Sequence, residues 1–116
     1  MKEIKTFDEI ILHEKGEGFK SLTGKPVILD FYADWCGPCK ISSPSVERIT
    51  DEHAEVDAFK VDISESPELA AVFNIRSIPT FIIITPDGKV ATKLGWETEE
   101  AFETFVQNSI TSDEEN

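Results

Sequence analysis

The chain has 116 residues, 23 of them acidic and 11 basic, which gives a formal net charge of -12 at pH 7. This length fits a single domain, and the 40% of hydrophobic residues suffice for a core. The negative field disfavours nucleic acid and anionic membrane surfaces as partners, because both repel an acidic protein, and no apolar stretch is long enough to cross a bilayer.

The first 25 residues carry the weakest pattern in the chain. Thr6 and Glu9 have the spacing of a helix capping box, and apolar residues follow them at helical intervals. This pattern predicts one or two short helical turns joined by a loop. A strand around residues 2–5 would be very short.

The first clear strand is the apolar run from Val27 to Ala33, which Asp30 interrupts. A nearly continuous apolar run is typical of a central strand that is buried on both faces. A buried carboxylate is costly unless it is partnered or protonated, and burial raises its pKa. Asp30 is therefore a candidate general base six residues before a cysteine. The alternative is a solvated residue on a half-exposed strand.

The hexapeptide Trp35-Cys36-Gly37-Pro38-Cys39-Lys40 follows this strand and contains both cysteines of the chain. Pro38 suits the first turn of a helix, so Cys36 would lie at the helix N-terminus. Free N–H groups and the positive end of the helix dipole stabilise a thiolate there. Cys39 follows one turn later on the same face and can close a bond to Cys36. The hexapeptide thus predicts a redox-active dithiol/disulfide pair.

Three other uses of the two cysteines fit the sequence less well. A static structural bridge is unnecessary in a chain with this much core. A structural zinc site needs four ligands, and neither His13 nor His53 has a partner at metal-ligand spacing. Two inert thiols would leave the Gly-Pro spacer unexplained. We therefore predict no metal site.

Strands and helices alternate through the rest of the chain. The pattern predicts a helix over 38–54 that contains Pro44, a strand over 56–61, a short helix over 66–74, strands over 81–85 and 90–94, and a helix over 98–110. A strand, a helix and a strand at the first of these spacings indicate a parallel βαβ unit. Lys60 on the second strand can then reach Asp30 if the two strands are adjacent; otherwise it is a solvated edge lysine.

With the features up to Pro79 taken together, the chain resembles the thioredoxin family. The resemblance covers roughly Pro26 to Ile110 and rests on several features in the family's order. These are the strand with Asp30, Trp35-Cys36-Gly37-Pro38-Cys39-Lys40, Pro44, Lys60-Val61-Asp62, Ile78-Pro79-Thr80, Asp87-Gly88 and Gly95. It implies an α/β thioredoxin fold with a mixed sheet of four or five strands flanked by helices on both faces. Residues 1–110 would form the domain, and 111–116 a disordered acidic tail.

The resemblance also implies roles for individual residues. Cys36, exposed and of lower pKa, attacks a client disulfide, and the more buried Cys39 resolves the mixed disulfide. Asp30, coupled to Lys60, takes the proton from Cys39. The Ile78-Pro79 bond is expected to be cis and to face the cysteines. The expected substrate contacts are Trp35, Gly37, Pro38, Ile78, Pro79, Gly95 and Trp96, although Trp96 is equally consistent with a core aromatic.

The chain departs from the family pattern at Tyr32, where tryptophan is frequent, and at Ile41-Ser42-Ser43, which replaces a more apolar stretch. Both departures leave the thiol chemistry intact.

A thioredoxin-type activity would be that of a protein-disulfide reductase. The chain carries no nucleotide-binding fingerprint, so we expect no cofactor of its own and regeneration by an external thioredoxin reductase. The expected partners are disulfide-containing client proteins, and the chain is expected to be a monomer. Its charged N-terminus lacks the apolar core of a signal peptide, which predicts a cytoplasmic location. Two alternatives remain: a docking subunit without turnover, and a disulfide oxidase or isomerase, which the Gly-Pro spacer disfavours.

Overall fold

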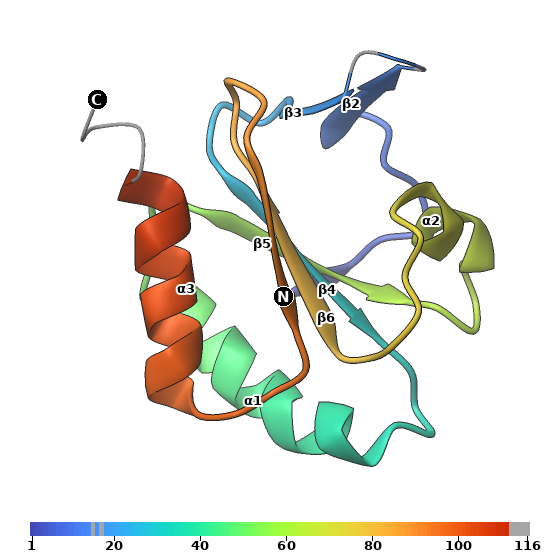
Figure 1. The fold of residues 1–116 in the computed structure, drawn as a ribbon, viewed down its shortest axis with the longest axis vertical. Coiled ribbons are helices and arrows are strands. Elements are labelled where there is room, and N and C mark those ends of the chain that lie inside the picture. Colours follow the sequence, from blue (N-terminus) through green and yellow to red (C-terminus); the bar gives the residue numbers. More distant parts are fainter. Residues whose placement is uncertain (15, 17, 112–116) are drawn as a thin grey trace.

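A mixed β-sheet forms the centre of the molecule (Figure 1). The computed structural model describes residues 1–14, 16 and 18–111, and within them the sheet has five strands. In spatial order these are β1 (Lys2–Glu3), β5 (Asp57–Asp62), β4 (Val27–Tyr32), β6 (Thr80–Ile84) and β7 (Val90–Leu94). β1, β5 and β4 are parallel, whereas β6 and β7 continue the sheet in antiparallel pairs. The very short β1 decides between the two predicted strand numbers in favour of five.

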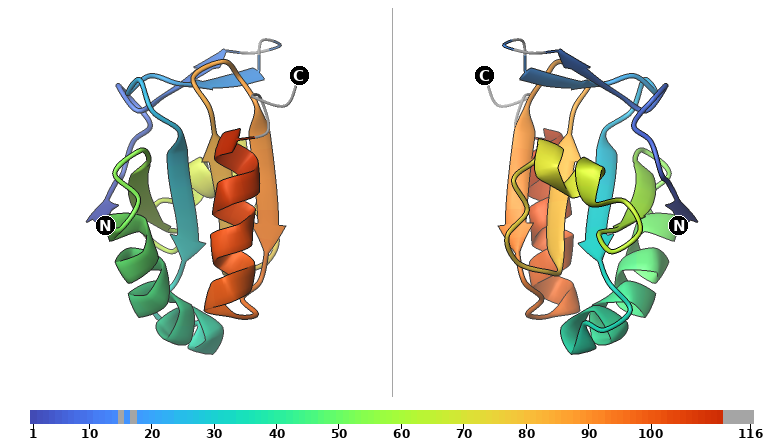
Figure 2. Two further views of the ribbon diagram at one scale, coloured as in Figure 1. Left: turned by 90° about the vertical axis from the view of Figure 1, so that its left-hand side faces the viewer. Right: turned by 90° about the vertical axis from the view of Figure 1, so that its right-hand side faces the viewer.

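Helices cover both faces of this sheet, as predicted (Figure 2). α1 (Gly37–Asp51) and α3 (Glu99–Thr111) pack on one face, and the short α2 (Pro67–Val72) packs on the other. None of the helices in the described part of the chain has the length and apolar character needed to span a membrane.

The central strand β4 is buried on both faces, which confirms the prediction from its apolar run. Successive side chains of a strand point to opposite faces, so its residues divide between two cores. Val27, Leu29 and Phe31 pack on the α2 side, and Ile28 packs on the side of α1 and α3. Asp30 lies between Leu29 and Phe31 in the chain and therefore points to the face that α1 and α3 cover.

The prediction of helical turns in the first 25 residues is wrong over most of its length. A single turn forms where the Ile11 N–H donates to the Phe7 carbonyl oxygen at 3.1 Å. Glu9 has a φ of 67°, a left-handed conformation that stops the helix at once. The chain then forms an antiparallel hairpin of β2 (Ile11–Glu14) and β3 (Gly18–Ser21). This hairpin is favoured by packing against the rest of the protein, such as that of Ile11 and Phe19 in the core on the α2 side. A local sequence pattern does not contain that information.

The other predicted elements are present, with ends that differ by a few residues. α1 ends at Asp51 rather than at 54, and α2 ends at Val72 rather than at 74. β5 begins one residue later than predicted and β6 one residue earlier. Thr111, assigned to the predicted tail, is the last residue of α3, and 112–116 lie outside the described residues.

His53, just beyond α1, ties that helix to α3. Its Nε2 contacts Glu103 Oε2 on α3, and its Nδ1 lies 3.2 Å from Glu55 Oε2. Burial alone would lower the pKa of His53, but the hydrogen bonds to Glu103 and Glu55 outweigh it and raise that pKa. A raised folded pKa means that the stabilisation is complete below the unfolded value of 6.5 and is lost as pH rises through the folded pKa.

We expect His53→Gln to lower the free energy of unfolding by about 0.5–1 kcal/mol at about pH 6 and by less at about pH 8. Urea denaturation at the two pH values measures this difference. Glu103→Gln is the matched variant, because it removes the charged partner and should show the same pH dependence. Equal losses at both pH values would show that the ion pair is not the cause.

Candidate active site

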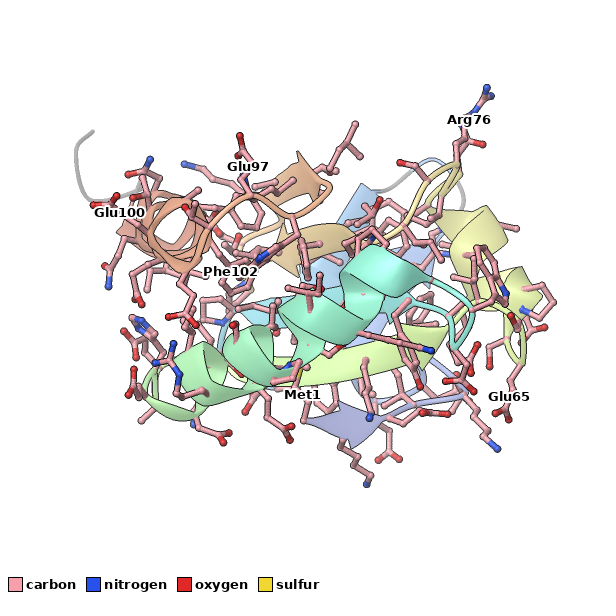
Figure 3. The ribbon with its side chains drawn as sticks, turned by 90° about the horizontal axis from the view of Figure 1, so that it is seen from below. Met1, Glu65, Arg76, Glu97, Glu100 and Phe102 are labelled. Atoms are coloured by element: carbon pink, nitrogen blue, oxygen red, sulfur yellow. A yellow bond between two sulfur atoms is a disulfide. The ribbon has the colours of Figure 1, made fainter. Side chains whose placement is uncertain are left out.

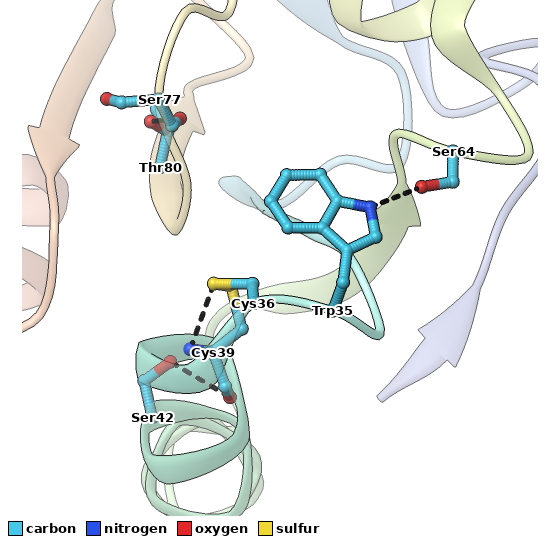
Figure 4. The surroundings of a disulfide bond; sticks show 7 residues. All are labelled: Trp35, Cys36, Cys39, Ser42, Ser64, Ser77 and Thr80. Atoms are coloured by element: carbon cyan, nitrogen blue, oxygen red, sulfur yellow. Dashed lines mark hydrogen bonds between the residues drawn. A yellow bond between two sulfur atoms is a disulfide. The ribbon is translucent and has the colours of Figure 1, made fainter.

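The two cysteines lie where β4 leads into α1. Cys36 is the N-cap residue of α1, with φ and ψ of -89° and 108°, and Gly37 and Pro38 form the first turn. A disulfide joins Cys36 to Cys39 (Figure 4). The Cys39 N–H also donates a hydrogen bond to Cys36 Sγ at 3.2 Å. The predicted place of Cys36 at the start of a helix is therefore confirmed, and its sulfur accepts from one of the free N–H groups of the first turn.

The two cysteines barely differ in solvent exposure, although Cys36 was expected to be the more exposed. In the disulfide form Cys36 is 4% exposed and Cys39 is 2% exposed, so the prediction of an exposed Cys36 is wrong for this state. The pair forms a buried cluster with Ala33, and Ile78 packs against this cluster. The two sulfurs differ instead in position, because only Cys36 caps the helix. Trp35 beside them is 71% exposed, and its indole N–H donates to Ser64 Oγ at 3.1 Å (Figure 4).

Asp30 is buried on β4, the strand that leads to this site. The residue is 1% exposed, and its two carboxylate oxygens have no hydrogen-bond partner among the described residues. Burial raises the pKa of Asp30 to about 7, and the charge of Lys60 offsets part of that rise. The alternative of a solvated aspartate is therefore wrong.

Lys60 lies on the strand next to Asp30. The two residues are in register on the parallel pair β4 and β5, so their side chains share one face of the sheet. The sequence predicted that Lys60 can reach Asp30 only if their strands are adjacent, and this adjacency of β4 and β5 is confirmed. Their part in proton transfer stays a prediction.

A loop before β6 faces the cysteines and contains a cis Ile78-Pro79 bond, as the resemblance implied. Thr80 Oγ1 donates to the Ser77 carbonyl oxygen at 2.7 Å and closes this loop (Figure 4). Gly95 at the end of β7 donates its N–H to the Pro79 carbonyl oxygen at 2.8 Å. Gly95 adopts a φ of 78°, a conformation that favours glycine.

A cleft of about 310 Å³ lies beside the loop. Trp35 and Ile78, both predicted as substrate contacts, line it. Ile63, Ile75 and Arg76 also line the cleft, and sequence reasoning missed all three. Arg76 projects away from the body of the protein (Figure 3). Ile75 and Arg76 could have been predicted as lining residues, because they come just before the Ile78-Pro79 dipeptide. Ile63 could not, because it lies in a turn after β5 that is distant in the sequence.

Trp96 packs toward the core. Its ring centroid lies 6.3 Å from that of Phe81 and 5.8 Å from that of Phe102, which α3 contributes. Of the two alternatives for this residue, the geometry therefore favours the core aromatic. A substrate contact by Trp96 stays a prediction.

Three carboxylates converge in one place, where they are potential metal ligands. In the part of the chain that the structure describes, carboxylate oxygens of Glu3, Asp62 and Glu65 lie within 4.8 Å of one another. Acidic groups of this kind are common without a bound ion. Neither cysteine belongs to the cluster, so it gives no support to a cysteine-based zinc site.

Comparisons with known proteins agree on one family. The thioredoxin family model matches residues 3–108. A thioredoxin of Acidithiobacillus ferridurans is 33% identical over 106 residues, which is 88% of this chain and 98% of that protein. A thioredoxin of Borreliella burgdorferi is 36% identical over 85 residues, or 72% of this chain and 73% of that protein. The crystal structure of Malassezia sympodialis thioredoxin is 36% identical with a TM-score of 0.64, covering 74% of this chain and 76% of that one.

Proposed function

Because this chain belongs to the thioredoxin family, we propose that it reduces client disulfides with Cys36 as the attacking thiol and Cys39 as the resolving thiol. The observation that carries this assignment is the position of Cys36. It caps α1 and is bonded to Cys39, and Ile78 of the cis-proline loop packs against the cluster of Ala33, Cys36 and Cys39. A sulfur at a helix N-terminus is the one whose thiolate form is favoured.

The reaction proceeds by two exchanges. The Cys36 thiolate attacks one sulfur of a client disulfide, forms a mixed disulfide and releases the other client sulfur as a thiolate. Cys39 then loses its proton and attacks Cys36 Sγ, which forms the Cys36–Cys39 disulfide and releases the second client thiolate. The client gains two electrons, and the two cysteines lose them.

Asp30 is the proposed acceptor of the Cys39 proton. A general base works best when its pKa lies near the working pH, and burial places the pKa of Asp30 at about 7. Lys60, in register with Asp30, stabilises the ionised form. Asp30 and Cys39 lie on the same side of the sheet, since α1 covers the face to which Asp30 points.

The client segment is proposed to lie across the loop at Pro79. The cleft lined by Trp35 and Ile78 offers an apolar place for a client side chain, and the exposed Gly37 and Pro38 border the helix start. Gly95 adds no side chain, and a Cβ built there would meet nothing within 4 Å, so any side chain at this position would project into open space.

Turnover requires an electron donor, which we propose to be a thioredoxin reductase acting on a monomer of this chain. We place the reaction in the cytoplasm, where thiols are kept reduced and a CxxC pair is more often catalytic than structural.

Dithiothreitol-driven cleavage of a disulfide-bonded model protein tests the proposed function. The wild-type chain should accelerate cleavage in catalytic amounts, and Cys36→Ser should lose the acceleration. Ser45→Ala, which alters an exposed side-chain contact of α1 with Glu99, is the matched control and should keep it. Undiminished activity of Cys36→Ser would refute the assignment.

Substitution of Gly95 should affect protein clients more than small ones. We expect Gly95→Ala to lower kcat/KM for a disulfide-bonded protein several-fold and to leave the reduction of a small aromatic disulfide nearly unchanged. The left-handed backbone should also cost about 1 kcal/mol of stability. Paired kinetic assays at a temperature where the variant is folded measure both effects. Gly24→Ala, also at positive φ, is the control for stability alone, and equal losses for the two substrates would remove Gly95 from the docking surface.

A further inference from the structure

Three charged side chains lie in a row on one face of the sheet. Asp30 on β4 is in register with Lys60 on β5, and Lys60 is in register with Glu3 on β1. Paired residues on adjacent strands project from the same face. The single ammonium group of Lys60 therefore lies between two carboxylates, one fully buried and one at the sheet edge.

Tyr32 contacts both Glu3 and Lys60. Its hydroxyl donates a hydrogen bond to Glu3 Oε1, and Lys60 Nζ lies 5.6 Å from the centroid of its ring. Tyr32 also packs against the cluster that Cys36 and Cys39 form with Ala33. Burial and the hydrogen bond to Glu3 raise the pKa of Tyr32. The hydroxyl thus stays protonated and remains a donor to Glu3 throughout the working range of the protein.

We propose that Tyr32 and Glu3 are positioning residues that keep the Lys60 ammonium directed at Asp30. The Tyr32 hydroxyl occupies the Glu3 carboxylate, and the ring holds the ammonium by a cation–π contact. The hydrogen bond holds the Glu3 carboxylate at the sheet edge and thereby limits its approach to Lys60. The oxygens of Asp30 have no hydrogen-bond partner among the described residues. The Lys60 ammonium is therefore the group that offsets the cost of burying the Asp30 charge. The consequence for catalysis rests on the proposed function, in which Asp30 receives the Cys39 proton.

Other charged groups also face Lys60 or Tyr32, but each has its own partner or lies outside the row. From α1, Glu47 faces Lys60, and its carboxylate binds the α-amino group of Met1 at 2.6 Å. Asp62 on β5 and Glu65 beyond it each place a carboxylate oxygen within 4.8 Å of a Glu3 carboxylate oxygen. Asp62 accepts a hydrogen bond from the Ser64 N–H at 2.9 Å, and Glu65 pairs with Lys5 at 3.4 Å. Asp34, after β4, is exposed. Glu3 is therefore the carboxylate whose position the Tyr32 hydroxyl fixes by its hydrogen bond.

Removal of the hydroxyl should release Glu3 toward Lys60. An opposite charge at about 4–6 Å lowers a carboxyl pKa by about 1–3 units, so partial loss of Lys60 should raise the titration midpoint of Asp30 by roughly 0.5–1 pH unit. The rise requires the charge of Glu3. Tyr32→Phe should produce it, and Tyr32→Phe combined with Glu3→Gln should match Glu3→Gln alone.

The test is a ¹³C NMR titration of the Asp30 carboxyl in four oxidised proteins: wild type, Tyr32→Phe, Glu3→Gln and the double variant. A midpoint raised in Tyr32→Phe and restored by the second substitution supports the proposal. A midpoint that does not move in Tyr32→Phe overturns it. So does a rise that persists in the double variant, because general loosening around the ring would then be the cause. Glu47→Gln is the matched control, and the effect of Tyr32→Phe should be the same in its presence.

The titration needs no turnover, so it separates this inference from the proposed function. A second readout is the plateau rate of peptide-disulfide reduction at saturating peptide, which reports the resolving step. If the midpoint rises in Tyr32→Phe and the pH profile of the plateau rate rises with it, both assignments are supported. If the midpoint rises while the pH profile stays fixed, Lys60 is positioned as proposed and Asp30 is not the base.

Discussion

Asp30→Asn is expected to stabilise the oxidised protein at alkaline pH by up to about 4 kcal/mol. Burial raises the pKa of this carboxyl from 3.8 to about 7. Between those values the folded protein keeps a proton that the unfolded chain releases, so the wild-type protein loses stability as pH rises. Each pKa unit is worth about 1.4 kcal/mol. An amide carries no charge and avoids this loss.

Chemical denaturation of oxidised wild-type and Asp30→Asn proteins at about pH 4 and about pH 9 measures this gain. The two proteins should differ by less than about 1 kcal/mol at the lower pH, where the carboxyl is protonated in the folded state. Asp8→Asn is the control, because it removes a carboxylate that is exposed rather than buried. It should give no gain at either pH. A gain for Asp30→Asn that is independent of pH would show that packing, not charge burial, is responsible.

The same substitution should slow catalysis in one step only. Asp30→Asn is expected to slow release of the client from the mixed disulfide at neutral pH more than it slows formation of that disulfide, because Asp30 takes the proton of Cys39 and not of Cys36. Rapid-mixing kinetics with a fluorescent peptide disulfide separate the two rates. Equal effects on both steps would remove Asp30 from the base role.

Cys39→Ser should trap clients covalently on Cys36. A serine hydroxyl cannot displace the client from the mixed disulfide, so the adduct accumulates instead of turning over. We expect reduction to fall to background and adducts to appear by mass spectrometry at Cys36. Cys36→Ser should trap nothing, although it keeps one cysteine at the same site. Adducts at Cys39 in that variant would reverse the assigned roles.

The double variant Cys36→Ser/Cys39→Ser addresses the docking alternative. Many covalent clients of Cys39→Ser, all lost in the double variant, are expected of a reductase. One partner that is retained without either sulfur would instead indicate a docking subunit.

The predictable part of this protein is encoded in local patterns. The apolar run around Asp30 predicted a strand buried on both faces, and the Gly-Pro spacer predicted Cys36 at a helix start; both are confirmed. The cis bond at Pro79 followed only from the family resemblance, because an X-Pro bond in a sequence is compatible with either isomer.

The features that escaped prediction depend on contacts between distant segments. The hairpin of β2 and β3 is held by packing such as the stack of Phe19 on Phe73, with centroids 4.4 Å apart. The cluster that contains Cys36 is packed against Ile78, which lies 42 residues further along the chain. The hydrogen bond between Tyr32 and Glu3 crosses β5 from β4 to β1. None of these contacts leaves a periodic signal in the chain.

The equilibrium reduction potential of the Cys36–Cys39 pair against glutathione tests the central claim most directly. Thioredoxins as a family have a known potential of about -270 mV. A value near it is expected, since the chain shares the family's Gly-Pro spacer and helix-capping cysteine. A potential between about -180 and -120 mV, the range of disulfide isomerases and oxidases, would contradict the assignment of this chain as a reductase.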